Sequence, residues 1–218
     1  MIFTYPQQAL FNRPVPKNKI YAHAKPRKSV KDKFVTQVSE IIWKYKLSPA
    51  TTNLPPRDGY SEIQVFEIAL REQELGNDVI NVIDKTIPYP IIFHLLYQKR
   101  IKGVVAFKRP AQDASNSWVI EEYFETAWLD HKTPTLSLPV ALDIKSLYEQ
   151  IMKTYIGIPA RRGESLESLV ERIRQMKQYQ RELRLLETKM KSERQFNRKV
   201  DLNAHIRKLN RQINVLTK

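Results

Sequence analysis

The stretch Glu62-Ile-Gln-Val-Phe-Glu-Ile68 decides the fold class, because its side chains alternate between two faces along its whole length. Ile63 and Val65 fall on one face, and Phe66 and Ile68 fall on the other, which is the period of two that a β-strand requires. Each face carries a mixture of apolar and polar groups. We therefore predict a β-strand over residues 62–68.

Downstream segments extend this strand into a sheet. Ile91–Tyr97 is an apolar run of strand length, which is typical of a strand buried on both faces. Lys102–Lys108 and Ser117–Trp128 are further candidate strands. The alternation in Ser117–Trp128 is interrupted around Glu121-Glu122, which indicates a β-bulge there.

Helices are expected between and after these strands. Apolar residues recur at three- and four-residue steps over residues 30–45, and Ser29 is a favourable N-cap, so we predict a helix that ends before Pro49. Shorter helices are expected over residues 77–88 and 143–155. The sequence therefore predicts an α+β fold with a mostly antiparallel sheet and flanking helices.

The domain organisation follows from composition. Residues 1–28 are rich in proline and lysine, and we predict a basic, extended N-terminal arm. The α+β domain is expected over 29–156, and the glycines and proline of 157–163 indicate a linker. Residues 164–218 contain neither Gly nor Pro, which strongly favours helix.

The C-terminal segment carries apolar residues at heptad spacing in two seams that are out of phase with each other. We therefore predict a coiled-coil-like helical hairpin with a turn near residues 192–198; one long helix with a stutter is the alternative. A two-helix hairpin is marginal alone, so its apolar positions are expected to dock on the rest of the chain or on another protein's helices, and a protein partner is the preferred interpretation. These apolar positions are Leu166, Leu169, Ile173, Met176, Leu183, Leu202, Ile206, Leu209 and Ile213.

Charge is segregated along the chain. The net charge is +14 and the isoelectric point is near 9.9. Residues 1–48 carry 10 basic and 2 acidic side chains, residues 49–160 carry 11 and 14, and residues 161–218 carry 16 and 7. Basic ends on a mildly acidic middle favour contact with nucleic acid phosphates, of DNA rather than RNA in our ranking. The candidate contacts are Lys17, Lys19, Lys25, Arg27, Lys28, Lys31, Lys33, Arg194 and Arg198.

Several functional classes are excluded by composition. The absence of cysteine excludes disulfides, thiol catalysis and thiolate metal sites, and no glycine motif of the dinucleotide-binding or P-loop kind is present. We therefore expect neither a cofactor nor a metal. No apolar stretch approaches the roughly 20 residues of a membrane helix, so we expect a cytoplasmic protein that does not contact the membrane.

Two weaker patterns concern chemistry. Asp130-His-Lys132 has the Asp-x-Lys spacing of metal-dependent nucleases, and Glu67 or Glu62 is the candidate partner carboxylate; the same spacing occurs on predicted helix surfaces. A polar pocket is the second pattern, with candidates Thr51, Thr52, Asn53 and Lys108. Asp84 and Lys85 are expected to form surface ion pairs, and His94 is expected to be a hydrogen-bonded core residue rather than a ligand.

Six stretches in sequence carry a resemblance: Leu47-Ser-Pro-Ala-Thr-Thr-Asn-Leu54, Ser61-Glu-Ile-Gln-Val-Phe-Glu-Ile68, Ile83-Asp-Lys-Thr-Ile-Pro-Tyr-Pro-Ile-Ile92, Ala106-Phe-Lys108, Tyr123-Phe-Glu-Thr-Ala-Trp128 and Gln195-Phe-Asn-Arg-Lys-Val-Asp-Leu-Asn203. Together they resemble a bacterial family known as domain of unknown function 4391. The resemblance brings no catalytic residue. It implies a gene beside site-specific DNA methyltransferases and type III restriction-like or SNF2-like helicases, and hence an accessory subunit of a DNA-modification or phage-defence system.

Three functional hypotheses follow. We rank first a non-enzymatic accessory subunit that contacts nucleic acid through its basic segments and docks a larger helicase or methyltransferase through its C-terminal helices. The second hypothesis is a metal-dependent nuclease subunit of the same kind of system. The third is a structural protein that forms a homodimer through the hairpin.

Overall fold

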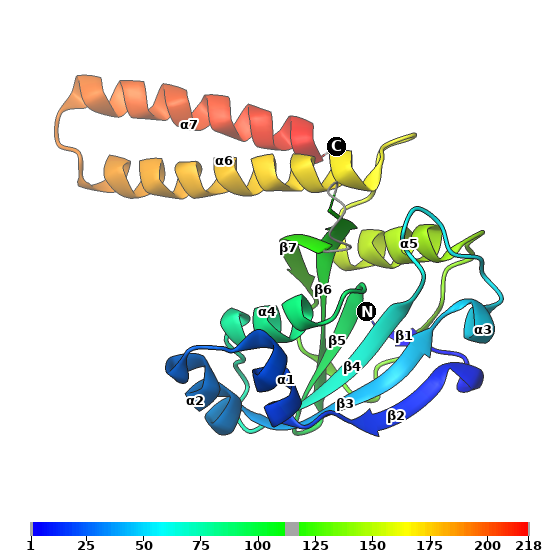
Figure 1. Cartoon of the computed structure of the whole chain (residues 1–218). Helices are drawn as coiled ribbons and strands as arrows, with labels where there is room; N and C mark the ends of the chain where they lie inside the picture. Colours follow the sequence, from blue (N-terminus) through cyan, green and yellow to red (C-terminus); the bar gives the residue numbers. More distant parts are fainter. Residues whose placement is uncertain (1, 112–117, 218) are drawn as a thin grey trace. The chain divides into compact units, whose positions relative to one another are not determined.

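The computed structural model describes residues 2–111 and 118–217 and divides the chain into two compact units, Met1–Gly157 and Ile158–Lys218 (Figure 1). The first unit, called the body below, has mixed helices and strands. The second unit consists of the long helices α6 (Leu166–Ser192) and α7 (Phe196–Thr217). The division falls at the start of the predicted linker.

Within the described residues of the body, seven strands form one sheet (Figure 1). Its order is β2 (Leu10–Pro14), β3 (Val38–Leu47), β4 (Ile63–Leu70), β5 (Ile91–Tyr97), β6 (Arg100–Pro110) and β7 (Trp118–Glu125), with β8 (Leu129–Asp130) also paired to β6. All neighbours are antiparallel except β4 and β5, which are parallel. The predicted α+β class and mostly antiparallel sheet are confirmed.

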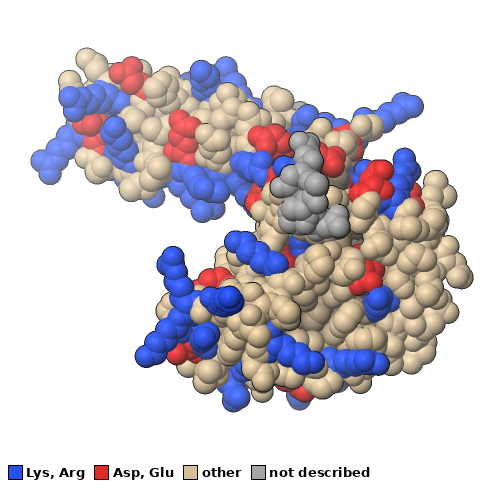
Figure 2. Space-filling view, in the orientation of Figure 1, with Lys and Arg blue, Asp and Glu red and all other residues tan. Residues whose placement is uncertain are grey.

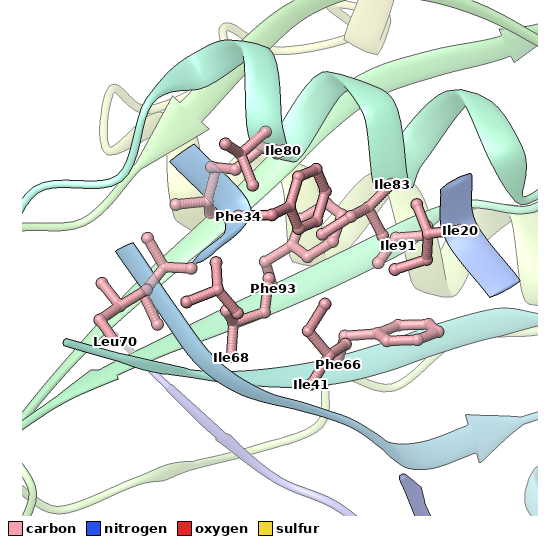
Figure 3. Packing of buried hydrophobic residues seen from close by; sticks show 14 residues of the cluster. Ile20, Phe34, Ile41, Phe66, Ile68, Leu70, Ile80, Ile83, Ile91 and Phe93 are labelled. Atoms are coloured by element: carbon pink, nitrogen blue, oxygen red, sulfur yellow. The ribbon is translucent and has the colours of Figure 1, made fainter. Parts of the chain in front are cut away.

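Helix α4 (Asn77–Thr86) makes the crossover between the parallel strands β4 and β5, as parallel pairing requires. Figure 3 shows Ile80 and Ile83 of this helix lying over Ile68 and Phe93 of the sheet. All four side chains are at most 4% exposed. This face of the sheet, with its apolar helix, forms the main core.

Helix α5 (Ile144–Ile156) covers the opposite face. A Cβ atom on Gly103 would lie 2.5 Å from the hydroxyl oxygen of Tyr155 in this helix, whereas the next residue, Val104, belongs to the α4 core. Because successive residues of a strand point to opposite faces, α5 and α4 lie on different sides of β6. Asp143 caps α5 as predicted, since its carboxylate accepts a 2.7 Å hydrogen bond from the Ser146 amide.

The predicted strands and the bulge agree with the observed register. β4 and β5 coincide with the alternating stretch and with the apolar run. In the pairing of β6 with β7, Phe107 lies opposite Glu122 and Lys108 lies opposite Ile120, so Glu121 is the extra residue of a bulge. Of the predicted strand Ser117–Trp128, Ser117 lies outside the described residues.

The helix predicted over residues 29–48 is wrong in its second half. Helix α2 (Lys28–Gln37) ends at Gln37, and the chain continues directly into β3, which pairs with both β2 and β4. The β-branched and aromatic residues of β3 also fit a period of two, and pairing on both sides decides for the strand. Tertiary context here overrides a helical spacing that is present in the sequence.

The predicted extended arm is also wrong, because residues 3–24 fold as part of the body. A parallel pair joins β1 (Phe3–Thr4) to β9 (Leu136–Ser137), a 3₁₀ turn spans Gln7–Ala9, and β2 pairs with β3. Helix α1 (Lys17–Ala24) contacts α4 and buries Ile20. The prolines flank these elements instead of breaking them; Pro16 is the N-cap of α1. The short helix α3 (Pro49–Thr52) follows β3.

Helices α6 and α7 pack against each other as the predicted hairpin, with residues 193–195 between them. Arg172, which is 6% exposed, fastens the open end of the hairpin. Its guanidinium donates two hydrogen bonds to Glu164, at 2.7 and 2.8 Å, and others to the carbonyls of Leu216 (2.6 Å) and Pro159 (3.0 Å). The hydrogen bond from Arg172 lowers the pKa of Glu164 to about 2. In the described part of the chain, no helix combines the length and apolarity needed to cross a membrane.

Candidate functional site

A cleft of about 450 Å³ opens on the α4 side of the body. Its walls come from β2, from α1, from the middle of β3 and β4, and from the end of α4 with the residues that follow. The lining residues are Phe11, Arg13, Pro14, Val15, Pro16, Lys19, Ile20, His23, Trp43, Gln64, Phe66, Ile83, Thr86, Ile87, Pro88 and Tyr89. Sequence-distant segments therefore meet at this cleft.

Aromatic rings form one side of the cleft. The register of β2 and β3 places Arg13 opposite Trp43. The ring centroids of Phe11 and Trp43 are 4.3 Å apart, and Trp43 lies 5.9 Å from Phe66 with only 11° between the ring planes. The indole nitrogen of Trp43 donates a 3.0 Å hydrogen bond to the Tyr45 carbonyl, which fixes the ring. The cleft thus offers a continuous aromatic surface.

Positive charge surrounds this surface. The Arg13 guanidinium lies 4.5 Å from the centre of the Phe11 ring, and α1 contributes Lys19 to the lining. No lining residue carries a carboxylate. The cleft therefore favours a ligand that combines a flat apolar part with negative charge.

Gln64 is the polar group at the base of the cleft and is 3% exposed. Its side-chain nitrogen donates a hydrogen bond to Glu62, and Lys46 lies 2.7 Å from the same carboxylate. Because a carboxylate only accepts hydrogen bonds, this contact sets the orientation of the amide. The amide oxygen has no hydrogen-bond partner within residues 2–111 and 118–217.

Lys108 fixes the residues that follow α4 in the chain and line one wall of the cleft. Its Nζ atom donates to the Asp84 carbonyl (2.8 Å) and carboxylate (2.9 Å), and to the carbonyls of Ile87 and Tyr89, both at 2.9 Å. Lys108 and Asp84 are 1% and 0% exposed, and Tyr123 also donates to Asp84, at 3.0 Å. Burial raises the pKa of Asp84 and lowers the pKa of Lys108, and their ion pair opposes both shifts.

These contacts correct two expectations. Asp84 is a fully buried partner of Lys108 and not part of a surface pair with Lys85. The pocket predicted from Thr51, Thr52, Asn53 and Lys108 is not formed, because the threonine hydroxyls make local hydrogen bonds. Thr51 donates to the Lys46 carbonyl and Thr52 to the Ser48 carbonyl, at 2.7 and 2.8 Å, and Asn53 ends α3 with φ 57°. None of the four lines the cleft.

The predicted phosphate contacts fall into two groups. Lys17 and Lys33 are used within the body: Lys17 donates to the Phe34 and Val38 carbonyls, and Lys33 pairs with Asp78 at 2.6 Å. Burial, with a smaller effect of Arg71, lowers the pKa of Lys17. The second group is exposed and has no ion pair among the described residues: Lys19, Lys25, Arg27, Lys28 and Lys31.

We call these five residues the basic surface. They lie on α1, on α2 and between them, and Figure 2 shows Lys and Arg side chains gathered over the part of the body that these helices occupy in Figure 1. The remaining predicted contacts, Arg194 and Arg198, belong to the hairpin, where Arg198 lies 3.9 Å from Glu193.

The predicted nuclease residues are not brought together. Glu67 in β4 pairs with Lys44 at 3.1 Å, and the Asp130 carboxylate in β8 accepts a 2.8 Å hydrogen bond from the Lys132 amide. Since β5 and β6 separate β4 from β8, roughly 14 Å of sheet lies between Glu67 and Asp130. A shared cation needs ligands at about 2 Å. The described residues hold no group of three side chains suited to bind a metal.

The predicted docking residues are covered by other residues of the same chain. Leu166, Leu169, Ile173, Met176, Leu202, Ile206 and Leu209 are buried, and Leu183 and Ile213 are half-buried. The heptad pattern thus marks the packing seam of the hairpin rather than a free surface. The exposed apolar residues of the hairpin are Leu185, Phe196, Val200 and Val215.

His94 lies in the core as predicted, 3% exposed, with its Nε2 atom 3.3 Å from the Tyr5 hydroxyl. Sequence reasoning missed the cleft residues Arg13, Trp43 and Gln64. The available signal was a Phe-x-Arg pair before a proline, but the assignment of residues 30–45 to a helix hid the strand pairing that brings Trp43 beside it.

The fold and the cleft define an α+β protein with a cationic aromatic cleft and an appended helical hairpin. The family model described as Domain of unknown function (DUF4391) matches residues 3–213, and the chain belongs to this family. Neither a curated protein nor a solved structure matches the chain.

Proposed function

We propose that the chain is a non-enzymatic accessory subunit of a bacterial DNA-modification or phage-defence system. In this proposal the basic surface contacts nucleic acid, and the hairpin docks a larger helicase or methyltransferase. The kind of system is what the family resemblance implies. The observation that carries the nucleic-acid contact is the basic surface.

Free charge supports this contact. Lys19, Lys25, Arg27, Lys28 and Lys31 are exposed and, among the residues described, are not neutralised by carboxylates. Lys17 and Lys33 of the same region, by contrast, have partners within the body. Unneutralised cations on neighbouring helices attract the phosphates of a polyanion and release its counterions.

Exposed apolar side chains support the docking role. Phe196 is 77% exposed and Leu185 is 72% exposed, and they lie near the turn of the hairpin, at the start of α7 and in the last third of α6. Covering large exposed apolar side chains with a partner removes apolar surface from water and so favours binding. The hairpin seam itself is already packed, so docking at this end needs no opening of the helices.

The nucleic-acid contact is tested by replacing all five residues of the basic surface with Gln in the full chain. The logarithm of the binding constant for DNA falls with the logarithm of salt concentration by about 0.7–0.9 per phosphate neutralised. The slope should therefore fall by about 3.5–4.5 if all five residues contact phosphates. Fluorescence anisotropy across a salt series measures it.

A matched variant removes charge elsewhere on the body: Lys99→Gln, Arg100→Gln and Lys132→Gln together. Its slope should stay close to that of the unaltered chain. An unchanged slope in the five-residue variant, with its circular dichroism spectrum intact, would remove the basic surface from the proposal.

Docking is tested by co-purification with the products of the adjoining genes. Phe196→Gln with Leu185→Gln should abolish recovery of the large partner, whereas Val140→Gln, at an apolar residue of the body that is 90% exposed, should not. Equal recovery with both variants contradicts a docking role for the hairpin.

A further inference from the structure

We infer that the cleft of the body binds a nucleobase together with its phosphate, and that a single strand supplies this base when the chain contacts nucleic acid. The source of the base rests on the proposed function. The recognition itself rests on the cleft alone.

The ligand must be anionic. Arg13 and Lys19 at the rim are exposed and have no ion pair within the described ranges, and His23 stands beside them. No Asp or Glu lines the cleft to neutralise these cations. A phosphate supplies the missing charge and accepts the hydrogen bonds of the guanidinium and the ammonium.

The ligand must also have a flat apolar part. The rings of Phe11, Trp43 and Phe66 succeed one another at 4.3 and 5.9 Å, and apolar side chains from α1 and α4 face them. Figure 3 shows Ile20, Ile83 and Phe66 pointing toward a common region from two helices and the sheet. Aromatic surfaces of this kind stack nucleobases, whatever the base.

The size of the cleft selects an unpaired base. Its volume of about 450 Å³ falls in the range of small-molecule sites, roughly 300–1,000 Å³. A duplex keeps its bases stacked and paired inside, so only a single strand, or a base rotated out of the helix, presents a base to such a site. The lysines of the basic surface continue from α1 onto α2, which provides phosphate contacts beside the cleft.

Gln64 adds a preference among bases. Its amide nitrogen is held by Glu62, which leaves the amide oxygen as an acceptor at the base of the cleft. Adenine, cytosine and guanine carry an exocyclic amino group that can donate to this oxygen, whereas the donor of thymine is its ring N3–H, whose two flanking carbonyl oxygens repel the amide oxygen. We therefore expect adenine to be bound more tightly than thymine.

The test compares an oligodeoxyadenylate of about 12 nucleotides with an abasic strand of the same length. The unaltered chain should bind the first about tenfold more tightly. Phe11→Leu should abolish that difference without changing the affinity for the abasic strand, and Leu142→Ala, at an exposed apolar residue of the body outside the cleft, should change neither. Gln64→Met should remove the preference for oligodeoxyadenylate over oligothymidylate.

A second experiment uses deoxyadenosine monophosphate alone. Its binding is measured as quenching of Trp43 fluorescence in a chain that carries Trp118→Phe and Trp128→Phe. Saturable quenching that Arg13→Gln weakens supports the cleft as a nucleotide site, even if no strand binds and the proposed function fails. Equal binding of the normal and abasic strands with no quenching overturns the cleft and leaves the basic surface intact. If neither strand nor nucleotide binds, both proposals are wrong.

Discussion

Burial of His94 in the centre of the sheet makes the stability of the body depend on pH. The side chain is 3% exposed and its described polar contact is the Tyr5 hydroxyl, 3.3 Å away. Burial lowers the pKa of His94 from 6.5 to about 4. In the unfolded chain the imidazole binds a proton near its ordinary pKa of about 6.5.

The sign of the effect follows from these two values. Between pH 6.5 and about 4 the unfolded chain binds a proton that the folded chain does not, so the free energy of unfolding falls as pH falls through this window. Each pKa unit corresponds to about 1.4 kcal/mol, which gives a loss of about 3 kcal/mol by pH 4. The loss ends below the folded pKa, where both states are protonated.

The assay is urea unfolding of the unaltered chain and of the His94→Gln variant at about pH 7 and about pH 4. Tryptophan fluorescence reports on the body alone, because Trp43, Trp118 and Trp128 all belong to it. The difference in unfolding free energy between the two chains should change by about 3 kcal/mol across this range. His205→Gln, on the hairpin, controls for loss of an imidazole.

The reasoning is refuted if the difference between the unaltered chain and His94→Gln is the same at both pH values. A change of the opposite sign would mean that the folded state holds the protonated imidazole. Comparing the two chains cancels the titration of the carboxylates that they share, so the result reports on His94.

Three further outcomes are expected. Lys108→Met leaves the Asp84 carboxylate buried without its ammonium and should lower the free energy of unfolding by about 3–5 kcal/mol, with Asp84→Asn in the same chain restoring part of it in urea titrations. Tyr155→Phe removes a buried hydroxyl that has no hydrogen-bond partner among the described groups, and should raise the same free energy by about 1 kcal/mol; a loss of stability contradicts this. Arg172→Met unfastens the end of the hairpin, so amide hydrogen exchange near Leu216 should become faster while exchange in the body stays unchanged.

Elements whose own sequence determines their conformation could be predicted without knowing which segments they contact. β4 and β5 are apolar enough to be buried on either side, so their period and composition suffice. The bulge at Glu121 and the cap at Asp143 are local features and were also predictable. The turn of the hairpin followed from the phase slip between two heptad seams.

The remaining features depend on contacts between distant segments. Residues 38–45 fit both a helical and an extended period, and the pairing of β3 with two neighbours decides between them. Lys108 and Asp84 are 24 residues apart, and only the crossover of α4 over the sheet brings them together. The cleft requires the pairing of β2 with β3, which the assignment of residues 1–28 to an extended arm concealed.

The junction of α2 with β3 has a mechanical consequence. Helix and strand follow each other at Gln37 and Val38 without an intervening residue, and Lys17 donates to carbonyls on both sides, at Phe34 and Val38. One side chain therefore holds the last turn of α2 to the first residue of β3. If the basic surface binds phosphates and the cleft binds a base, as proposed, the two sites would belong to one continuous segment, because α2 carries Lys31 and β3, which follows it directly, carries Trp43.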